Sequence, residues 1–157
     1  MKSKFKNYIK EILSFFVVMI IISNVISLYK STDINKIKFD IDNILLHNKP
    51  ILVHFWATWC PTCKLEASNI QAVSQNYNII TIAVQSGDDN KIKKYLQENN
   101  LDFKVINDKN AFYANKYNIK VYPTTLIYDK NKNLIFSEVG YTSTFGLKIR
   151  LWWAGLK

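Results

Sequence analysis

The segment Trp59-Cys60-Pro61-Thr62-Cys63 contains the only two cysteines of the 157-residue chain. A continuous apolar run from Ile51 to Trp56 comes just before it, and a segment with helical periodicity follows. Such a run is typical of a buried strand in the middle of a sheet. The chain therefore has to pass from a central strand into a helix at the two cysteines, which favours an α/β fold.

The order strand, Cys-x-x-Cys, helix is typical of a redox dithiol. The first N–H groups of a helix that starts near Cys60 have no partner inside the helix, and the helix dipole adds partial positive charge there. Both effects favour the thiolate of Cys60. Pro61 suits the first helical position because its missing N–H is not needed there. We therefore predict that Cys60 is the nucleophile and that Cys63 resolves the mixed disulfide.

Three other interpretations of the cysteine pair explain less. Buried structural cysteines do not account for the spacing and position of the pair. A zinc site completed by His47 and His54 would lack a second closely spaced pair of ligands. A purely structural disulfide would close a very short loop and stabilise little. No metal site is predicted.

The N-terminal region contains an uncharged segment, residues 12–29, preceded by four lysines. As a helix this segment would be about 27 Å long, close to the hydrocarbon thickness of a bilayer. The lysines place residues 1–11 in the cytoplasm. We expect a single-pass anchor in the bacterial inner membrane, a linker over residues 30–36, and a periplasmic or extracytoplasmic domain over residues 37–157. A cleaved signal peptide is the alternative, although no small-residue cleavage site follows the segment.

The rest of the chain predicts alternating strands and helices with parallel pairing and right-handed crossovers. Strands are expected at residues 37–39, 51–56, 79–84, 103–106, 121–128 and 134–139, the last one antiparallel to its neighbour. Helices are expected after Cys60, from about residue 90, over 111–117 and over 143–153, with a helical turn near 42–46. The final helix is expected to be amphipathic, with the apolar side chains Phe145, Leu147, Ile149, Leu151 and Trp152.

Composition limits the function classes. The formal net charge of +9 comes mostly from scattered lysines, and no nucleic-acid motif or aromatic-interleaved basic stripe is present. We therefore expect no nucleic-acid partner. A basic balance weakly favours an anionic membrane surface or acidic partners.

Residues 51–64, with the dithiol at their end, resemble the strand, active-site loop and helix start of the thioredoxin superfamily. Tyr122-Pro123-Thr124 stands where that family carries its cis-proline. The predicted anchor, the run Phe-Trp-Ala-Thr-Trp-Cys and Glu66 resemble membrane-tethered TlpA/ResA-like thiol:disulfide oxidoreductases. Gln85-Ser86-Gly87-Asp88, Gly140-Tyr141-Thr142 and the Gly146 to Trp152 ending are most similar to the copper-sensitivity-suppressor D type.

The resemblance implies a thioredoxin-like fold, in which helices flank a central mixed sheet, preceded here by one transmembrane helix. It also implies that Pro123 is cis and faces the dithiol, with the Tyr122 backbone pairing with an extended substrate segment. Trp59, Pro61, Thr62 and Thr124 would complete the active-site loop and substrate surface.

His54 and Glu66 each have two interpretations. His54 stands where many thioredoxins place a buried acid, so it is either a proton relay to Cys63 or a packed core histidine. Glu66 lies in the first turns of the helix, where the dipole favours an acid in any case. We favour that explanation over a role in setting thiol acidity.

The expected function is thiol:disulfide exchange on protein substrates outside the cytoplasm, with no cofactor. Reduction is favoured over oxidation because the tethered group that the chain resembles often reduces its substrates. A reductant needs electrons from a membrane electron-relay dithiol protein. The alternative is a non-enzymatic copper(I)-binding module that uses the same two cysteines, because soft thiolates suit copper(I).

Overall fold

The structure, a computed structural model, describes residues 8–19, 21–22 and 49–157. Residues 8–19 and 21–22 are helical. Within the described ranges, no helix combines the length and the apolar character that crossing a membrane requires. The predicted anchor lies partly outside the described residues, and the expected linker, the strand at 37–39 and the turn near 42–46 lie wholly outside them.

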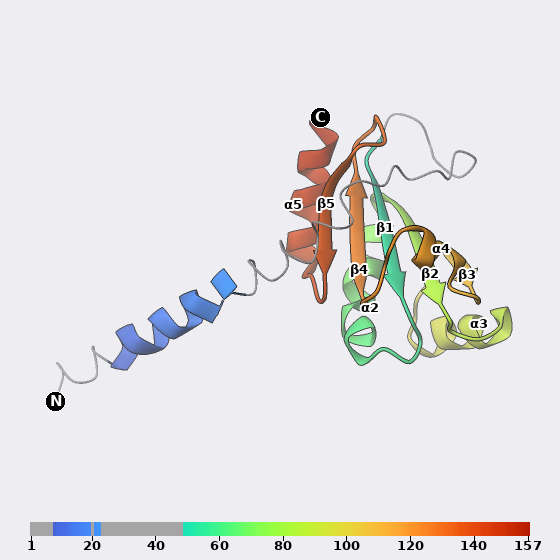
Figure 1. Cartoon of the computed structure of the whole chain (residues 1–157), viewed down its shortest axis with the longest axis horizontal. Helices are drawn as coiled ribbons and strands as arrows, with labels where there is room; N and C mark the ends of the chain where they lie inside the picture. Colours follow the sequence, from blue (N-terminus) through green and yellow to red (C-terminus); the bar gives the residue numbers. More distant parts are fainter. Residues whose placement is uncertain (1–7, 20, 23–48) are drawn as a thin grey trace.

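Five strands form one mixed sheet in the order β3-β2-β1-β4-β5 (Figure 1). Central strand β1 is parallel to β2 and antiparallel to β4. β2 is parallel to β3, and β4 is antiparallel to β5. The expected mixed sheet is therefore confirmed. The strands are β1 (Ile51–Trp56), β2 (Asn78–Val84), β3 (Val105–Asp108), β4 (Thr124–Tyr128) and β5 (Leu134–Val139).

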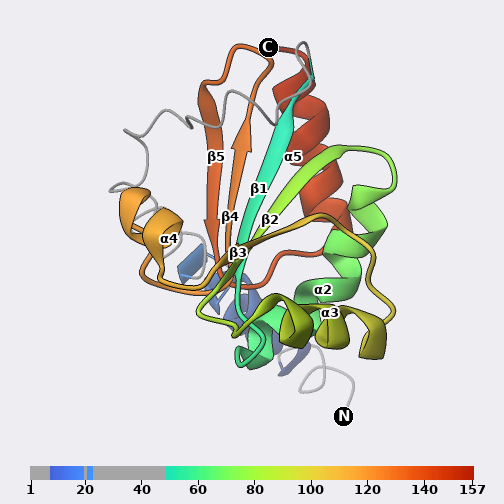
Figure 2. The same cartoon turned by 90° about the vertical axis from the view of Figure 1, so that its right-hand side faces the viewer.

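Helices cover both faces of the sheet (Figure 2). They are α2 (Pro61–Ser74), α3 (Asp89–Glu98), α4 (Phe112–Lys116) and α5 (Thr144–Gly155). One core cluster joins the sheet to α2, α3 and α5, whereas a second cluster joins the opposite face to α4. The two crossovers β1-α2-β2 and β2-α3-β3 lie on the same face because both are right-handed and proceed in the same direction along the sheet.

Strand β1 supplies side chains to both clusters, as its continuous apolar sequence predicts. Leu52 and Trp56 belong to the cluster under α2 and α5, and Val53 and Phe55 belong to the cluster on the α4 side. All six residues of β1 are buried. A strand buried on both faces has to be apolar along its whole length, because successive side chains point to opposite faces.

Two expected strands begin later than the sequence predicts. Strand β3 starts at Val105, and Phe103, which precedes it, packs its ring against Trp56 at 6.0 Å between ring centroids. Strand β4 starts at Thr124 because it follows Pro123, which has no N–H to donate to a neighbouring strand.

The expectation for the last helix is wrong in one respect. Leu147 and Leu151 are fully buried, whereas Phe145, Ile149 and Trp152 are exposed. Residues two apart lie on different faces of a helix, so an alternating apolar pattern cannot form a single buried face. Helix α5 is therefore apolar on two faces.

We expect Leu147→Ala to lower the free energy of unfolding by about 2–5 kcal/mol, because it leaves a cavity between α5 and the sheet. Denaturant unfolding of the oxidised protein measures this loss. Leu65→Ala is the matched control, since Leu65 is 72% exposed. Its effect should stay within about 0.5 kcal/mol. Equal losses in both variants would contradict the assigned burial.

Candidate active site

The two cysteines lie where β1 leads into α2, and they are joined by a disulfide. Cys60 is the N-cap of α2, and Pro61 occupies its first turn. The backbone N–H of Cys63 donates a hydrogen bond to Cys60 Sγ at 3.1 Å. The predicted arrangement, in which a free amide at the helix start faces the first sulfur, is therefore present.

Both cysteines are buried, and Cys63 is the more completely buried of the two. Cys60 is 6% exposed and Cys63 is 2% exposed. The residues beside Cys60 are open to solvent, because Trp59, Pro61 and Thr62 are all exposed. An approaching protein segment would therefore meet Cys60 before Cys63. Both cysteines belong to the core cluster under α2 and α5.

The Tyr122-Pro123-Thr124 segment lies beside this loop. The Tyr122–Pro123 peptide bond is cis. The Tyr122 ring meets the Trp59 ring edge to face at 5.8 Å between centroids. In the sheet, Thr124 is the register partner of Phe55, which places Pro123 next to the end of β1. The structure therefore brings the dithiol loop and the cis-proline segment together at one corner of the molecule.

A group that sequence reasoning missed holds the loop before Cys60. Ser86 Oγ accepts a hydrogen bond from the Thr58 N–H at 3.0 Å and donates one to the Val84 carbonyl at 3.1 Å. Trp59 Nε1 donates to the Gln85 carbonyl at 3.1 Å. The segment after β2 therefore orients the dithiol loop. Gln85 and Ser86 were part of the sequence resemblance, but nothing in their local pattern indicated this contact.

We expect Ser86→Ala to lower stability by about 1–3 kcal/mol, because it leaves the Thr58 N–H without its acceptor. Ser86 is fully buried, so water does not readily replace the hydroxyl. Thermal unfolding of the oxidised protein measures the effect. The control is Ser68→Ala on the exposed side of α2, which should change little. An unchanged melting temperature in Ser86→Ala would show that the loop is held by other contacts.

His54 lies in the middle of β1 and is buried. Its Nδ1 is 2.9 Å from Thr125 Oγ1 on β4. Burial lowers the pKa of His54 from its usual 6.5 to about 3, because the charged imidazolium would lose its water. His54 therefore stays neutral at physiological pH, and its low pKa weakens it as a proton acceptor.

Glu66 follows Cys63 by one turn of α2, on the buried face of the helix. Its Oε1 accepts a hydrogen bond from the Thr142 N–H at 3.1 Å. Among the hydrogen bonds of the described residues, none reaches Oε2. Burial raises the pKa of Glu66 from 4.5 to about 8, and the Thr142 hydrogen bond opposes this rise. The carboxyl group is therefore neutral at pH 7.

The explanation of Glu66 by the helix dipole is wrong. The first turn of α2 contains no acidic residue, because Glu66 lies in the second turn, and its side chain is fully buried. An ionised, solvated carboxylate that the dipole stabilises needs to be near the helix start. Glu66 is instead a buried acid one turn after Cys63, and it accepts a hydrogen bond from Thr142 in the segment before α5.

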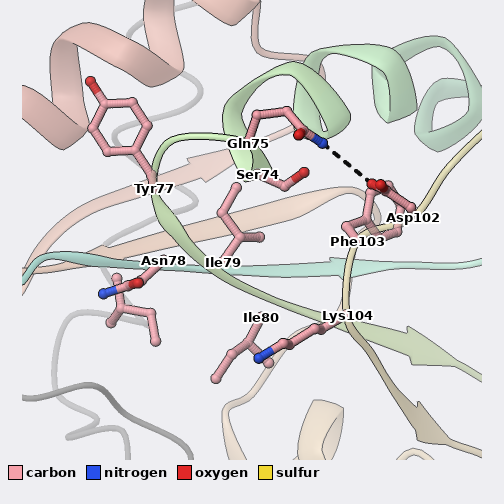
Figure 3. A pocket seen from close by; sticks show the side chains of 10 residues that line it. Ser74, Gln75, Tyr77, Asn78, Ile79, Ile80, Asp102, Phe103 and Lys104 are labelled. Carbon is pink, nitrogen blue, oxygen red and sulfur yellow. Dashed lines mark hydrogen bonds between the residues drawn. The ribbon is translucent and has the colours of Figure 1, made fainter.

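No group of three or more His, Cys, Asp and Glu side chains that could hold a metal ion occurs in the described part of the chain. A hollow of about 510 Å³ lies at the other end of the sheet (Figure 3). Its walls include Ile79, Phe103 and the hydrogen-bonded pair Gln75 and Asp102. Helix α2 has 14 residues, about 20 Å, and the hollow lies beyond its C-terminal end, so it is not part of the dithiol site.

Comparison with known proteins finds similar thioredoxin-like proteins. Residues 27–137 match the AhpC/TSA family. A thioredoxin-like protein of Haemophilus influenzae is 31% identical over 164 residues, covering 96% of this chain and 97% of that protein. The sporulation thiol-disulfide oxidoreductase A of Bacillus subtilis is 23% identical over 116 residues, covering 68% and 70%.

Among solved structures, a secreted Mycobacterium tuberculosis disulfide oxidoreductase superposes with a TM-score of 0.59. Its sequence is 25% identical, and the match covers 68% of this chain and 82% of that one. The thioredoxin-like α/β fold, with a mixed sheet flanked by helices, is therefore confirmed. Relatives of this chain include thiol-disulfide oxidoreductases.

Proposed function

The chain belongs to the AhpC/TSA family, and on that basis we propose that it is a thiol:disulfide oxidoreductase acting on protein thiols and disulfides. One observation carries the proposal. Cys60 Sγ lies at the N-terminus of α2, where it accepts a hydrogen bond from the Cys63 N–H. It also forms a disulfide with Cys63. A helix start lowers the pKa of a thiol placed there, which makes its thiolate available for exchange at neutral pH.

In the reducing direction, the Cys60 thiolate attacks one sulfur of a substrate disulfide. A mixed disulfide forms, and the other substrate sulfur leaves as a thiolate that takes up a proton. The Cys63 thiolate then attacks Cys60 Sγ, which releases the second substrate sulfur and closes the Cys60–Cys63 disulfide. Two electrons pass to the substrate, and the oxidising direction is the same sequence in reverse.

The neighbouring segments would bind the substrate. We assign Tyr122 and Pro123 to an extended substrate segment that pairs with the Tyr122 backbone, and Trp59 to the apolar surface beside it. Pro61 and Thr62 form the exposed start of α2, and Thr124 supports the turn through its hydrogen bond to the Val121 carbonyl. The contact between the Trp59 and Tyr122 rings supports a shared surface.

The two buried groups have different roles in this proposal. Glu66 sets the acidity of the dithiol, because a neutral carboxyl group can donate a hydrogen bond or transfer its proton close to Cys63. His54 orients the sheet beneath the site through Thr125, and a relay to Cys63 would use its neutral ring. The low pKa of His54 makes Glu66 the stronger candidate for proton transfer.

We further propose that the protein acts as a reductant outside the cytoplasm, as a tethered protein of the copper-sensitivity-suppressor D type. Residues 12–29 would anchor it in the inner membrane with residues 1–11 in the cytoplasm. A membrane dithiol protein would supply electrons. The uncharged segment behind four lysines supports the anchor, and the secreted relative supports the compartment.

Insulin reduction and refolding of scrambled ribonuclease, carried out with the full chain in detergent micelles, test this function. We expect turnover in at least one assay, and the reduction potential of the Cys60–Cys63 pair decides the direction. The same preparation is analysed for bound copper, since stoichiometric copper(I) without disulfide exchange would support the metal-binding alternative. Resistance to carbonate extraction tests the anchor separately.

A further inference from the structure

Helix α5 carries an exposed apolar stripe on the side away from the sheet. The stripe consists of Phe145, Ile149, Trp152 and Leu156, which are between 47% and 76% exposed. Trp153, which is 50% exposed, lies next to it. We call these five residues the α5 stripe. Large exposed apolar patches on a folded domain mark interaction sites.

The α5 stripe is continuous, because its four main residues follow one another at steps of four, three and four. Residues at such steps lie along one side of a helix. Leu147, Leu151 and Ala154, which are fully buried, form the opposite side. The core therefore uses one face of α5, and the other face has no partner among the residues that the structure describes. The stripe extends over about 16 Å.

The charges around the α5 stripe are positive. From residue 139 to residue 157 the sequence has no Asp or Glu. Lys148 lies on α5 beside the stripe, given 100° of rotation per residue, and Lys157 follows the C-terminal end of α5. Arg150, the third cation, is held by Glu138 at 2.7 Å and stays close to the domain. The two lysines are therefore the charges available to a partner, and they favour an anionic one.

We propose that the α5 stripe docks onto the surface of a bilayer that contains anionic lipids. Trp, Phe, Ile and Leu side chains with lysines at the edges suit the boundary between headgroups and acyl chains, where Trp is enriched. The lysine stems extend along the apolar surface while their ammonium groups reach lipid phosphates. Each such lysine strengthens binding to an anionic surface about fivefold.

A second copy of this chain fits the α5 stripe less well. Two stripes packed face to face would bring lysines of both copies together, with no acidic side chain on α5 to pair with them. Like charges placed across an interface oppose association. An anionic lipid surface covers the apolar stripe and neutralises both lysines.

The docking goes beyond the proposed function and does not depend on it. None of the contacts that define the dithiol corner involves a residue of the α5 stripe. It also differs from anchoring by residues 12–29, which would hold the chain near the membrane without bringing α5 into contact with lipid. Docking adds an orientation of the domain on the bilayer.

The four tryptophans allow a direct test, because they lie at positions 56, 59, 152 and 153 and none lies in the predicted anchor. The full chain is reconstituted into vesicles of phosphatidylcholine and phosphatidylglycerol with brominated acyl chains, which quench tryptophan on contact. We expect quenching in the wild type and its loss in the double variant Phe145→Glu/Ile149→Glu. Phe112→Glu is the matched control, since Phe112 is 64% exposed on α4 at the opposite face of the sheet. It should keep the quenching.

A milder double variant, Lys148→Gln/Lys157→Gln, leaves the apolar residues in place. We expect it to lower the ratio of docked to undocked domain about fivefold per lysine, and vesicles without phosphatidylglycerol should have a similar effect on the wild type. Unquenched wild type, equal quenching in the Phe145→Glu/Ile149→Glu variant, or self-association abolished by that variant in place of quenching would each overturn the proposal. Insulin reduction in every variant reports separately on the dithiol.

Discussion

The Cys60→Ser variant is expected to lose disulfide exchange completely, because the sulfur that forms the mixed disulfide is gone. Cys60 is the more exposed of the two cysteines and lies at the helix start, where a thiolate is favoured. Insulin reduction by the full chain measures the loss. Ser68→Ala, on the exposed side of α2, should retain wild-type turnover. Activity in Cys60→Ser above the rate without protein would contradict the assignment.

Cys63→Ser should fail in a different way. The first attack still takes place, but the second does not, so a covalent adduct between Cys60 and a substrate thiol accumulates. Non-reducing electrophoresis and intact mass detect this adduct, and dithiothreitol releases it. If Cys60→Ser accumulated the adduct in place of Cys63→Ser, the roles of the two sulfurs would be reversed.

The Glu66→Gln variant is expected to remove a large part of the pH dependence of folding stability between about pH 4.5 and pH 8. The pKa of Glu66 is about 8 in the folded protein and near 4.5 when the chain is unfolded. Above pH 4.5 the unfolded chain therefore loses this proton while the folded protein keeps it. Stability that is fully present below pH 4.5 is then lost as the pH rises to about 8.

The loss from this one group is of the order of 3–5 kcal/mol. His54 has the opposite effect, since its lowered pKa costs stability as the pH falls from 6.5 towards 3. The difference between wild type and Glu66→Gln at each pH isolates the carboxyl group. Denaturant unfolding of the oxidised protein at pH 4.5 and pH 8 measures it. Glu98→Gln, an exposed change on α3, should leave the profile unchanged, and a Glu66→Gln profile parallel to the wild type would falsify the assigned pKa.

Local sequence was enough to predict the dithiol corner in outline. The strand at Ile51–Trp56, the helix start at Pro61 and the position of Cys60 at that start depend on residues close together in the chain. The cis bond before Pro123 was implied only by resemblance, and the structure contains it.

Sequence reasoning failed where distant segments meet. Glu66 has the residue type of a solvated acid near a helix start, but burial keeps its carboxyl group neutral in spite of the opposing hydrogen bond from Thr142 in the segment before α5. Ser86 is a small polar residue in a loop, and its contact with Thr58 exists because β2 lies beside β1. These contacts join residues 28 or more positions apart.

The order of strands and helices and the place of Cys60 at a helix start follow from local sequence, because hydrophobic periodicity, proline and cysteine spacing act within a few residues. Which face of α5 enters the core and which remains open depends on where α2 and β4 lie, so this outcome appears only in the folded protein. The tertiary structure also decided the protonation of Glu66, since the cost of burying a charge depends on everything packed around it.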